Sequence, residues 1–340
     1  MTTGQAMHTP LNRRQLMQTL LGTSGVLAGM PAQAQANSGK LLFGFPRRGD
    51  GFVYASAVLK ELQAKGSYQP SLGADLTYLP GNSGLVALRA AHAAAPDGAT
   101  VLLCPSSQMT LLPQVQAMSK IDPSRDFVPV AALMSADVLF AVGPSTPSQV
   151  KTIKDYVAWV RDDPSQAGYG LPGRGTMPHF VATLMALSME VVLKPMAYNG
   201  TGAILVDLIA GGVPAGFLGI GTGTTMKALQ DAGVRPLAVT GSERWPGLPA
   251  VPTFSESGVG NVPPLETFGF FMSAAAPAAK VQALGDAIRQ ALRSPAVQAA
   301  QASTSQLALP KGADDYATLI AQERAAWNPL VKFHRFSGDA

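Results

Sequence analysis

The sequence predicts an α/β protein with two lobes, each built around a mostly parallel β-sheet. Apolar, strand-like segments alternate along the chain with segments of helical periodicity, which is typical of βαβ units. Four glycine-rich turns each lie between a predicted strand and a predicted helix. The chain has 340 residues, of which 47% are hydrophobic, and this is enough to bury two sizeable cores.

The first lobe is expected to begin with strands and helices in alternation. Strands are expected at residues 40–45, 76–79 and 101–104, and helices at residues 53–62 and 85–95. In the first helix, Val53, Ala57 and Leu62 follow helical spacing. Asp97 and Gly98 mark a turn before the third strand, whose lone cysteine, Cys104, is expected to be buried.

The chain is expected to cross into the second lobe at a strand over residues 139–142. This strand ends an apolar stretch, 128–142, that Asp137 interrupts. Beyond it the pattern predicts helices at 153–161 and in the apolar runs 180–189 and 203–209, an extended segment at 191–195, a strand at 234–240 and a proline-rich loop at 244–252.

A strand at 268–273 is expected to carry the chain back to the first lobe, and helices at 280–292 and 314–327 follow. The predicted first lobe is therefore 37–138 with 266–340, and the second lobe is 139–265.

The glycine-rich turns predict where a ligand binds. In open parallel sheets, ligands lie beyond the carboxyl ends of the strands. Turns 46–51 and 80–84 would line one wall of a cleft, and turns 173–176 and 198–202 the other. Accessible amides at the start of a helix favour a small anion. The predicted ligand-binding residues are Phe45, Arg47, Arg48, Gly49, Asp50, Gly81, Ser83, Ser106, Arg174, Gly175, Thr176, Tyr198, Gly200 and Thr201.

Several of these residues also have a structural interpretation. Arg47 and Arg48 either fork a ligand carboxylate, and so select ligands of higher negative charge, or form a solvated pair near Asp50. Thr176 and Thr201 either donate to the ligand or cap helices. The hydroxyl of Tyr198 either reaches the cleft or packs, and Ser106, Ser107 and Gln108 follow the third strand within reach of a ligand.

The sequence offers no catalytic or metal site that we can assemble, so we expect no enzyme activity and no cofactor. It has no G-x-S-x-G elbow, no G-x-x-x-x-G-K loop and no H-E-x-x-H helix. His179 has no nucleophile or orienting carboxylate that can be paired with it, so we expect it to line or cap the cleft. Trp245 and Trp327 are expected to pack, and Gly219, Gly221 and Gly223 to form a flexible segment. A net charge of +4 with 14% charged residues argues against nucleic acid as a partner.

The N-terminus predicts an export signal over residues 1–36. Arg13 and Arg14 precede an apolar segment, 20–30, that is too short to span a bilayer. Small residues then offer cleavage after Ala34 or Ala36. The paired arginines favour the twin-arginine route, with an ordinary Sec signal as the alternative. We expect a soluble, monomeric mature protein in the periplasm.

The order of several short landmarks resembles the Bug family, the extracytoplasmic receptors of tripartite tricarboxylate transporters. These landmarks are Phe45, Pro46, Pro80, Gly81, Gly84, Pro96, Asp97, Gly98, Asp126, Phe127, Gly173, Gly175, Thr176, His179, Tyr198, Gly200, Gly211, Gly212, the run 237–240, Arg244, Pro249, Pro252, Thr253, Glu256 and Gly258. The resemblance implies a type II periplasmic-binding-protein fold, in which two lobes close on a small carboxylate or amino-acid-like ligand. It also implies transient contact with membrane transporter subunits.

The sequence departs from the family pattern in the first ligand loop. The family usually continues after Phe45 and Pro46 with a second proline, glycines and Thr-Asp, whereas this chain has Arg47, Arg48 and, at the family's aspartate, Phe52. Pro214 and Leu218 also stand where the family often has acidic residues. These departures leave the ligand class open. Beside transport, three alternatives stay open: a receptor for a signalling partner, an unrecognised cleft hydrolase, and a protein whose pocket no longer binds a small ligand.

Overall fold

The computed structural model describes residues 39–44, 50–65, 72–115, 120–135, 137–220, 226–260, 262, 266–304 and 307–334. The chain divides into Met1–Asn37 and Ser38–Ala340, and every described residue belongs to the second unit. The predicted export signal therefore lies outside the described residues, as do Phe45, Arg47, Arg48 and Gly49.

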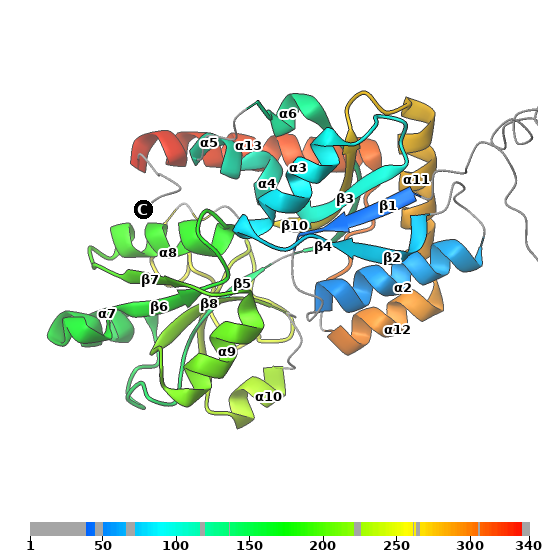
Figure 1. Ribbon diagram of the computed structural model, residues 1–340. Coiled ribbons are helices and arrows are strands. Elements are labelled where there is room, and N and C mark those ends of the chain that lie inside the picture. The colour runs from blue at the N-terminus through cyan, green and yellow to red at the C-terminus, as the bar shows by residue number, and fades with distance from the viewer. Residues whose placement is uncertain are drawn as a thin grey trace, which may run out of the picture. The chain divides into compact units, whose positions relative to one another are not determined.

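Within the described ranges the strands form two five-stranded sheets, one in each lobe (Figure 1). The first has the order β2-β1-β3-β10-β4 and contains β1 (Gly39–Phe43), β2 (Leu72–Tyr78), β3 (Thr100–Pro105), β4 (Phe127–Ser135) and β10 (Thr267–Ser273). The second has the order β7-β6-β8-β5-β9 and contains β5 (Val138–Val142), β6 (Gly168–Leu171), β7 (Lys194–Ala197), β8 (Ala215–Gly219) and β9 (Arg235–Val239).

In each sheet one strand runs against the others. β1 pairs in parallel with β2 and β3, but β10 is antiparallel to both β3 and β4. Likewise β6 is parallel to β7 and β8, but β5 is antiparallel to β8 and β9. β5 and β10 are the strands by which the chain enters a lobe from the other one. They start where the other strands end, so they run the opposite way. The α/β, two-lobed class is confirmed, but each sheet is mixed, because its one reversed strand makes two of its four pairings antiparallel.

Both faces of the first sheet are buried. In β1, Leu41 and Phe43 face a core with α2 (Asp50–Ala64), α11 (Ala278–Ala291) and α12 (Pro295–Thr304). The intervening Leu42 faces a second core with α3 (Leu85–Ala93) and α13 (Ala313–His334). Cover on both faces explains why the predicted strands are continuous apolar runs and do not alternate with polar residues.

The second sheet is covered in the same way. Phe140 of β5 packs with α7 (Ile153–Asp162) and α8 (Met177–Ser188), while the adjacent Leu139 and Ala141 pack with α9 (Thr201–Ala210) and α10 (Met226–Asp231). α7 begins with a capping box in which the Thr152 side chain accepts from the Asp155 amide and Asp155 accepts from the Thr152 amide. The predicted bounds of α7 are therefore correct to within one residue.

α13 contacts both lobes. Tyr316 and Ile320, in its first half, belong to a core of the first lobe. Trp327 is fully buried and, with Val331, belongs to a core of the second lobe, where its ring lies 6.0 Å from that of Phe180. The expected first lobe contains all of 266–340, and the helix is expected to end at residue 327. In the structure, the helix continues to His334 and packs on the second lobe.

Other elements differ from the predictions. The extended segment expected at 191–195 is a strand at Lys194–Ala197, because Glu190, with a φ of 49°, turns the chain at the end of α8 first. Several short elements have no counterpart among the expected ones: α4 (Ser107–Thr110), α5 (Leu112–Val115), α6 (Pro123–Asp126), α10, α12 and the 3₁₀ turns η1 (Asn82–Gly84) and η2 (Pro164–Gln166). In the described part of the chain, no helix is both long and apolar enough to cross a membrane.

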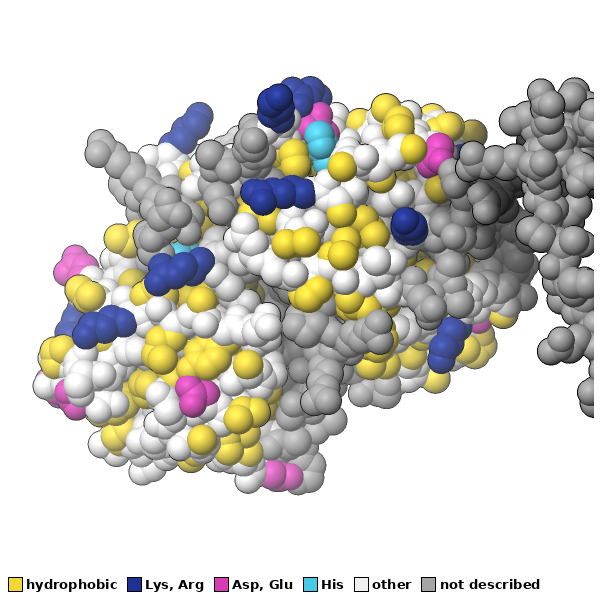
Figure 2. Space-filling view, viewed as in Figure 1, with side chains coloured by type: hydrophobic (Ala, Val, Ile, Leu, Met, Phe, Trp, Pro, Cys, Tyr) yellow, Lys and Arg dark blue, Asp and Glu magenta, His cyan; other side chains and the backbone are white. Residues whose placement is uncertain are grey.

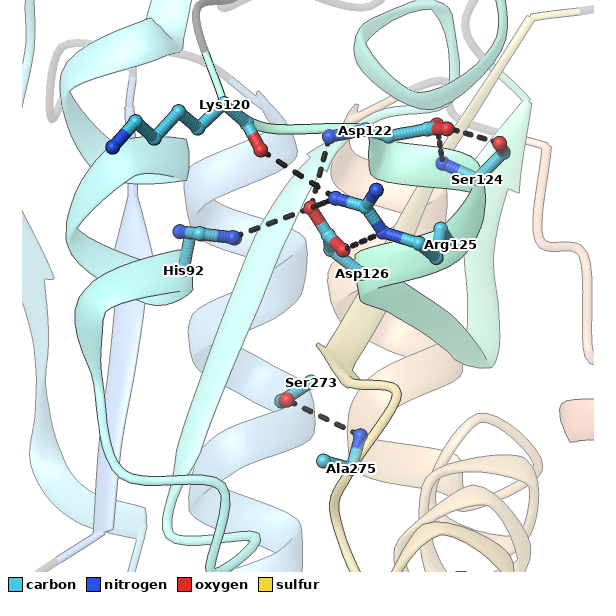
Figure 3. Close-up of polar contacts among 8 residues, drawn as sticks. All are labelled: His92, Lys120, Asp122, Ser124, Arg125, Asp126, Ser273 and Ala275. Atoms are coloured by element: carbon cyan, nitrogen blue, oxygen red, sulfur yellow. Dashed lines mark hydrogen bonds and ion pairs between the residues drawn. The ribbon is translucent and has the colours of Figure 1, made fainter.

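A charged network fixes α6 beside α3 (Figure 3). The Asp126 carboxylate accepts hydrogen bonds from Arg125 Nε at 2.7 Å and from the Asp122 amide at 2.9 Å, and His92 Nε2 lies 3.2 Å from the same carboxylate. The hydrogen bond from Arg125 is the largest cause that lowers the pKa of Asp126 to about 2. The family landmark at Asp126 therefore joins elements of the first lobe and lies outside the predicted cleft.

Candidate functional site

A pocket of about 350 Å³ lies where loops of the two lobes meet. The first lobe contributes Gly44, after β1, and the turn after β2. The second lobe contributes the turns after β6 and β7. The lining residues are Gly44, Gly81, Asn82, Ser83, Gly84, Pro172, Gly173, Arg174, Ala197, Tyr198, Asn199 and Gly200. Three of the four predicted turns thus converge on one pocket, and Gly44, two residues before the remaining turn at 46–51, lines it as well.

The turn of the first lobe has an unusual backbone. Gly81, Asn82, Ser83 and Gly84 all have positive φ, at 127°, 47°, 51° and 89°. Glycine adopts such angles freely, but asparagine and serine do so at a cost. The buried side chain of Gln108 supports the turn, since its Nε2 donates to the Ser83 carbonyl at 2.6 Å. Strain of this kind is typical of functional loops.

The turn 173–176 of the second lobe is held by its own side chains. Thr176 Oγ1 donates to the Gly173 carbonyl at 2.6 Å, and the Gly175 amide donates to His179 Nδ1 at 3.1 Å. Burial, and secondarily the charge of Arg174, lowers the pKa of His179 to about 4. At neutral pH the imidazole is therefore uncharged and Nδ1 is an acceptor. His179 has the capping role that the sequence analysis favoured over chemistry.

Two helices begin at the pocket without a side-chain cap. Gly84 is the N-cap of α3 and Gly200 is the N-cap of α9, and both line the pocket. Their first-turn amides and helix dipoles favour a negative charge. Among the described lining residues, Arg174 has the one charged side chain. The described part of the pocket is therefore suited to an anion.

Tyr198 lines the pocket, but its hydroxyl is engaged elsewhere. The hydroxyl donates to the carboxylate of Asp207, in the last turns of α9. Burial, followed by this bond, raises the pKa of Tyr198 to about 12. Asp207 in turn lies against Gly212, where a Cβ atom would come within 2.1 Å of Asp207 Oδ1. The bond fixes the tyrosine ring against α9.

The structure places other predicted residues outside the lining. Gly175 and Thr176 follow the lining residues Gly173 and Arg174 but do not line the pocket, and Thr201 Oγ1 accepts from the Gly219 amide at 3.3 Å. Ser106 is fully buried, and its Oγ accepts from the Thr267 amide at 3.0 Å. Asp50 begins α2, and its side chain is not described.

Sequence reasoning did not single out two features. Small and amide residues of the same turns, such as Asn82 and Asn199, line the pocket beside the predicted hydroxyls. The buried carboxyl groups of Glu266 and Glu323 contact residues that follow β3: Ser107 hydrogen-bonds Glu266, and Thr110 Oγ1 donates to Glu323 Oε1 at 2.7 Å. Burial raises the pKa of Glu266 to about 8 and that of Glu323 to about 7. Neither glutamate stands in a segment whose pattern signals burial of a charge.

This arrangement, with two α/β lobes and a pocket between their strand-to-helix turns, is that of the periplasmic binding proteins. Solved structures agree with it. An adipate-bound protein of R. palustris has a TM-score of 0.76 at 23% identity, covering 87% of this chain and 96% of its own. MatC from Rhodopseudomonas palustris with bound malate has a TM-score of 0.74 at 23% identity, covering 86% of this chain and 98% of its own.

Sequence comparison identifies the family. The model of the tripartite tricarboxylate transporter family receptor matches residues 76–335. Protein BugT of Bordetella pertussis is 25% identical over 323 residues, which cover 92% of this chain and 94% of the relative. The chain therefore belongs to the tripartite tricarboxylate transporter receptor family. The resemblance to Bug proteins is confirmed, and the family and fold are those of binding proteins rather than enzymes.

Proposed function

We propose that this protein is a periplasmic receptor that captures a small carboxylate-bearing metabolite between its lobes and delivers it to a tripartite tricarboxylate-type membrane transporter. The observation that carries the proposal is the meeting of two uncapped helix N-termini and Arg174 around a pocket of about 350 Å³. Both features stabilise a carboxylate without altering it.

The ligand class follows from the pocket and from the relatives. Adipate and malate, which the two structural relatives bind, are small dicarboxylates. One carboxylate would lie between the first turns of α3 and α9, with the Arg174 guanidinium beside it. Arg47 and Arg48, if they reach the second carboxylate, would favour ligands of higher negative charge. Loop amides and ordered waters would complete the contacts.

The binding test is a thermal-shift screen of malate, adipate, a matched monocarboxylate and a matched amine, followed by calorimetric titration. A ligand at about 100 times its Kd stabilises the folded state by about 2.7 kcal/mol. We expect the carboxylates, but not the amine, to raise the Tm. Native mass spectrometry of protein purified from the periplasm would identify a retained ligand. If no carboxylate raises the Tm and no ligand is retained, the proposal is wrong.

A variant pair tests the site itself. Arg174→Ala removes a charge-assisted contact, so affinity for the best carboxylate should fall by about 10- to 150-fold, equivalent to roughly 1.5–3 kcal/mol. Lys194→Ala is the control, because it removes an exposed positive charge of β7 that does not line the pocket. Equal affinities for the two variants would contradict the role of Arg174.

Localisation and assembly belong to the same proposal. Replacing Arg13 and Arg14 together by lysine should retain the protein in the cytoplasm if export uses the twin-arginine route. Fractionation of cells would show this, and size-exclusion chromatography with light scattering would test the expected monomer.

On the face seen in Figure 2, Lys and Arg side chains are scattered and form no continuous belt.

A further inference from the structure

We infer that Ser83 is a cross-cleft latch, a positioning residue whose hydroxyl holds the two lobes together over the pocket. Ser83 Oγ donates to the Arg174 carbonyl at 2.9 Å, and the two residues are 91 positions apart in the sequence. Ser83 belongs to the turn after β2 in the first lobe, and Arg174 to the turn after β6 in the second. The role of this latch in ligand capture rests on the proposed function, whereas the measurement of lobe closure that tests it needs no ligand.

The opposite turn is shaped to receive this hydroxyl. A Cβ atom at Gly173 would lie 2.7 Å from Ser83 Oγ, which is closer than real Cβ contacts allow. Gly173 is buried and lines the pocket beside Arg174. The absence of a side chain at residue 173 therefore lets the serine side chain reach the backbone of the other lobe.

The strained backbone conformation of Ser83 indicates that its side chain has a function. At a φ of 51° a glycine would be free of strain, whereas serine is not. The strained turn is held from beneath by Gln108, whose Nε2 donates to the Ser83 carbonyl at 2.6 Å and whose side chain is buried. The Gly84 amide also donates to the Gly81 carbonyl at 3.0 Å. A rigid turn presents the hydroxyl in one direction, as a latch requires.

The latch couples closure to capture through Arg174. The carbonyl of Arg174 accepts the latch bond, and the same residue lines the pocket where the carboxylate is proposed to bind. Closing the lobes therefore fixes the backbone from which the guanidinium extends. A broken latch should favour the open state and speed ligand release, while the first encounter with ligand is unchanged.

The test measures lobe closure without any ligand. Spin labels attached at Lys60→Cys in α2 and Lys154→Cys in α7, both exposed, report the distance between lobes by double electron–electron resonance. Cys104 is buried, and burial raises the pKa of its thiol well above the ordinary value, so it should resist labelling. Loss of one hydrogen bond should lower the closed-to-open ratio on the order of five-fold.

Two variants remove the latch from opposite sides. Ser83→Gly deletes the hydroxyl and removes the strain of a non-glycine residue at positive φ. The variant should therefore fold at least as well as the parent protein, and a thermal melt checks this. Gly173→Ala pushes the hydroxyl away. Because both break the same bond, the double variant should open no further than either single variant. Gly202→Ala is the control, since a Cβ there meets nothing within 4 Å.

Arg174→Ala separates the latch from ligand binding. It keeps the carbonyl and should leave closure unchanged, while affinity for malate or the best carboxylate of the screen falls. Ser83→Gly should instead open the ligand-free protein and raise the dissociation rate. If the distance distribution of Ser83→Gly matches that of the parent protein, the latch is refuted, whether or not any carboxylate binds.

Discussion

At the scale of single residues, burial decides what each polar group can do. His179 stands next to a ligand loop and has the side chain most often used for proton transfer. In the structure it is 4% exposed, and its Nδ1 accepts a backbone amide. The imidazole is therefore a fixed part of the loop. The hydroxyl of the half-buried Tyr198 is instead held by its hydrogen bond to the Asp207 carboxylate.

Replacing His179 tests this structural role. His179→Ala would leave the buried Gly175 amide without its acceptor, so the free energy of unfolding should fall by about 1–3 kcal/mol. His179→Asn places an oxygen near the position of Nδ1 and should recover much of the loss. Urea unfolding measures both variants. Equal losses for the two would show that packing, and not the accepted hydrogen bond, is what the histidine supplies.

The pH dependence of the same residue has a definite sign. The pKa of His179 is lowered to about 4 in the folded state, against about 6.5 in an unfolded chain. A lowered pKa contributes stability that is complete above pH 6.5 and is lost as pH falls toward 4. The stability difference between the parent protein and His179→Asn should therefore shrink between these pH values. A difference that is constant with pH would contradict the buried, neutral state.

At the scale of elements, the sequence predicts the helices and strands whose positions are determined by a pattern within the segment itself. The helix at residues 153–161 and the strands at 101–104 and 268–273 were predicted because periodicity, capping residues and apolar runs lie within the segment itself. Both crossing strands were located from the sequence, but their reversed direction was not predicted, because strand direction depends on which distant strands pair with them. Ser106 was placed at the cleft, yet its Oγ accepts from Thr267, which is 161 residues later. No local pattern shows which distant strand will cover a loop.

The positions of the turns could be predicted from the sequence, but the directions of their side chains could not. A glycine-rich turn between a strand and a helix has its place fixed by the sheet, so 80–84, 173–176 and 198–202 converge on the pocket. The direction of a hydroxyl within the turn depends on partners from elsewhere. Ser83 reaches the other lobe, while Thr176 folds back on Gly173.

The end of α9 offers a prediction about one element. A Cβ at Gly212 would lie 2.1 Å from Asp207 Oδ1, so Gly212→Ala must displace the carboxylate and break its bond with Tyr198. We expect a loss of about 1–2 kcal/mol in the free energy of unfolding. Tyr198→Phe should cost a similar amount, and the double variant little more, because both remove the same bond. Fully additive losses in chemical denaturation would refute the coupling.

At the scale of the whole molecule, buried acids mark the junction of the lobes. Asp137 lies between β4 and β5, Glu266 precedes β10, and Glu323 lies on α13, which contacts both lobes. Burial raises their pKa values to about 6, 8 and 7, respectively. The groups that act on them are Ser107, Glu323 and Asp137 on Glu266, Ser106, Thr110 and Arg324 on Glu323, and Ser135 and Thr240 on Asp137. Each of these three elements at the junction therefore carries a carboxyl group whose pKa is raised by burial.

The raised pKa values predict that stability falls as pH rises. A carboxyl whose folded pKa exceeds its unfolded value contributes stability that is complete below about pH 4.5 and is lost as pH rises through the folded pKa. For Glu266 and Glu323 the loss should extend to about pH 8 and amount to a few kcal/mol. Glu266→Gln and Glu323→Gln keep the shape but cannot ionise, so each should flatten the decline measured by denaturation between pH 5 and pH 8. The exposed Glu190→Gln should leave this decline unchanged.

If the free energies of unfolding of the parent protein and of Glu266→Gln decline in parallel, Glu266 is not protonated in the folded state at neutral pH. The junction would then tolerate a buried charge, and ionisation there would not limit the stability of the two-lobed molecule.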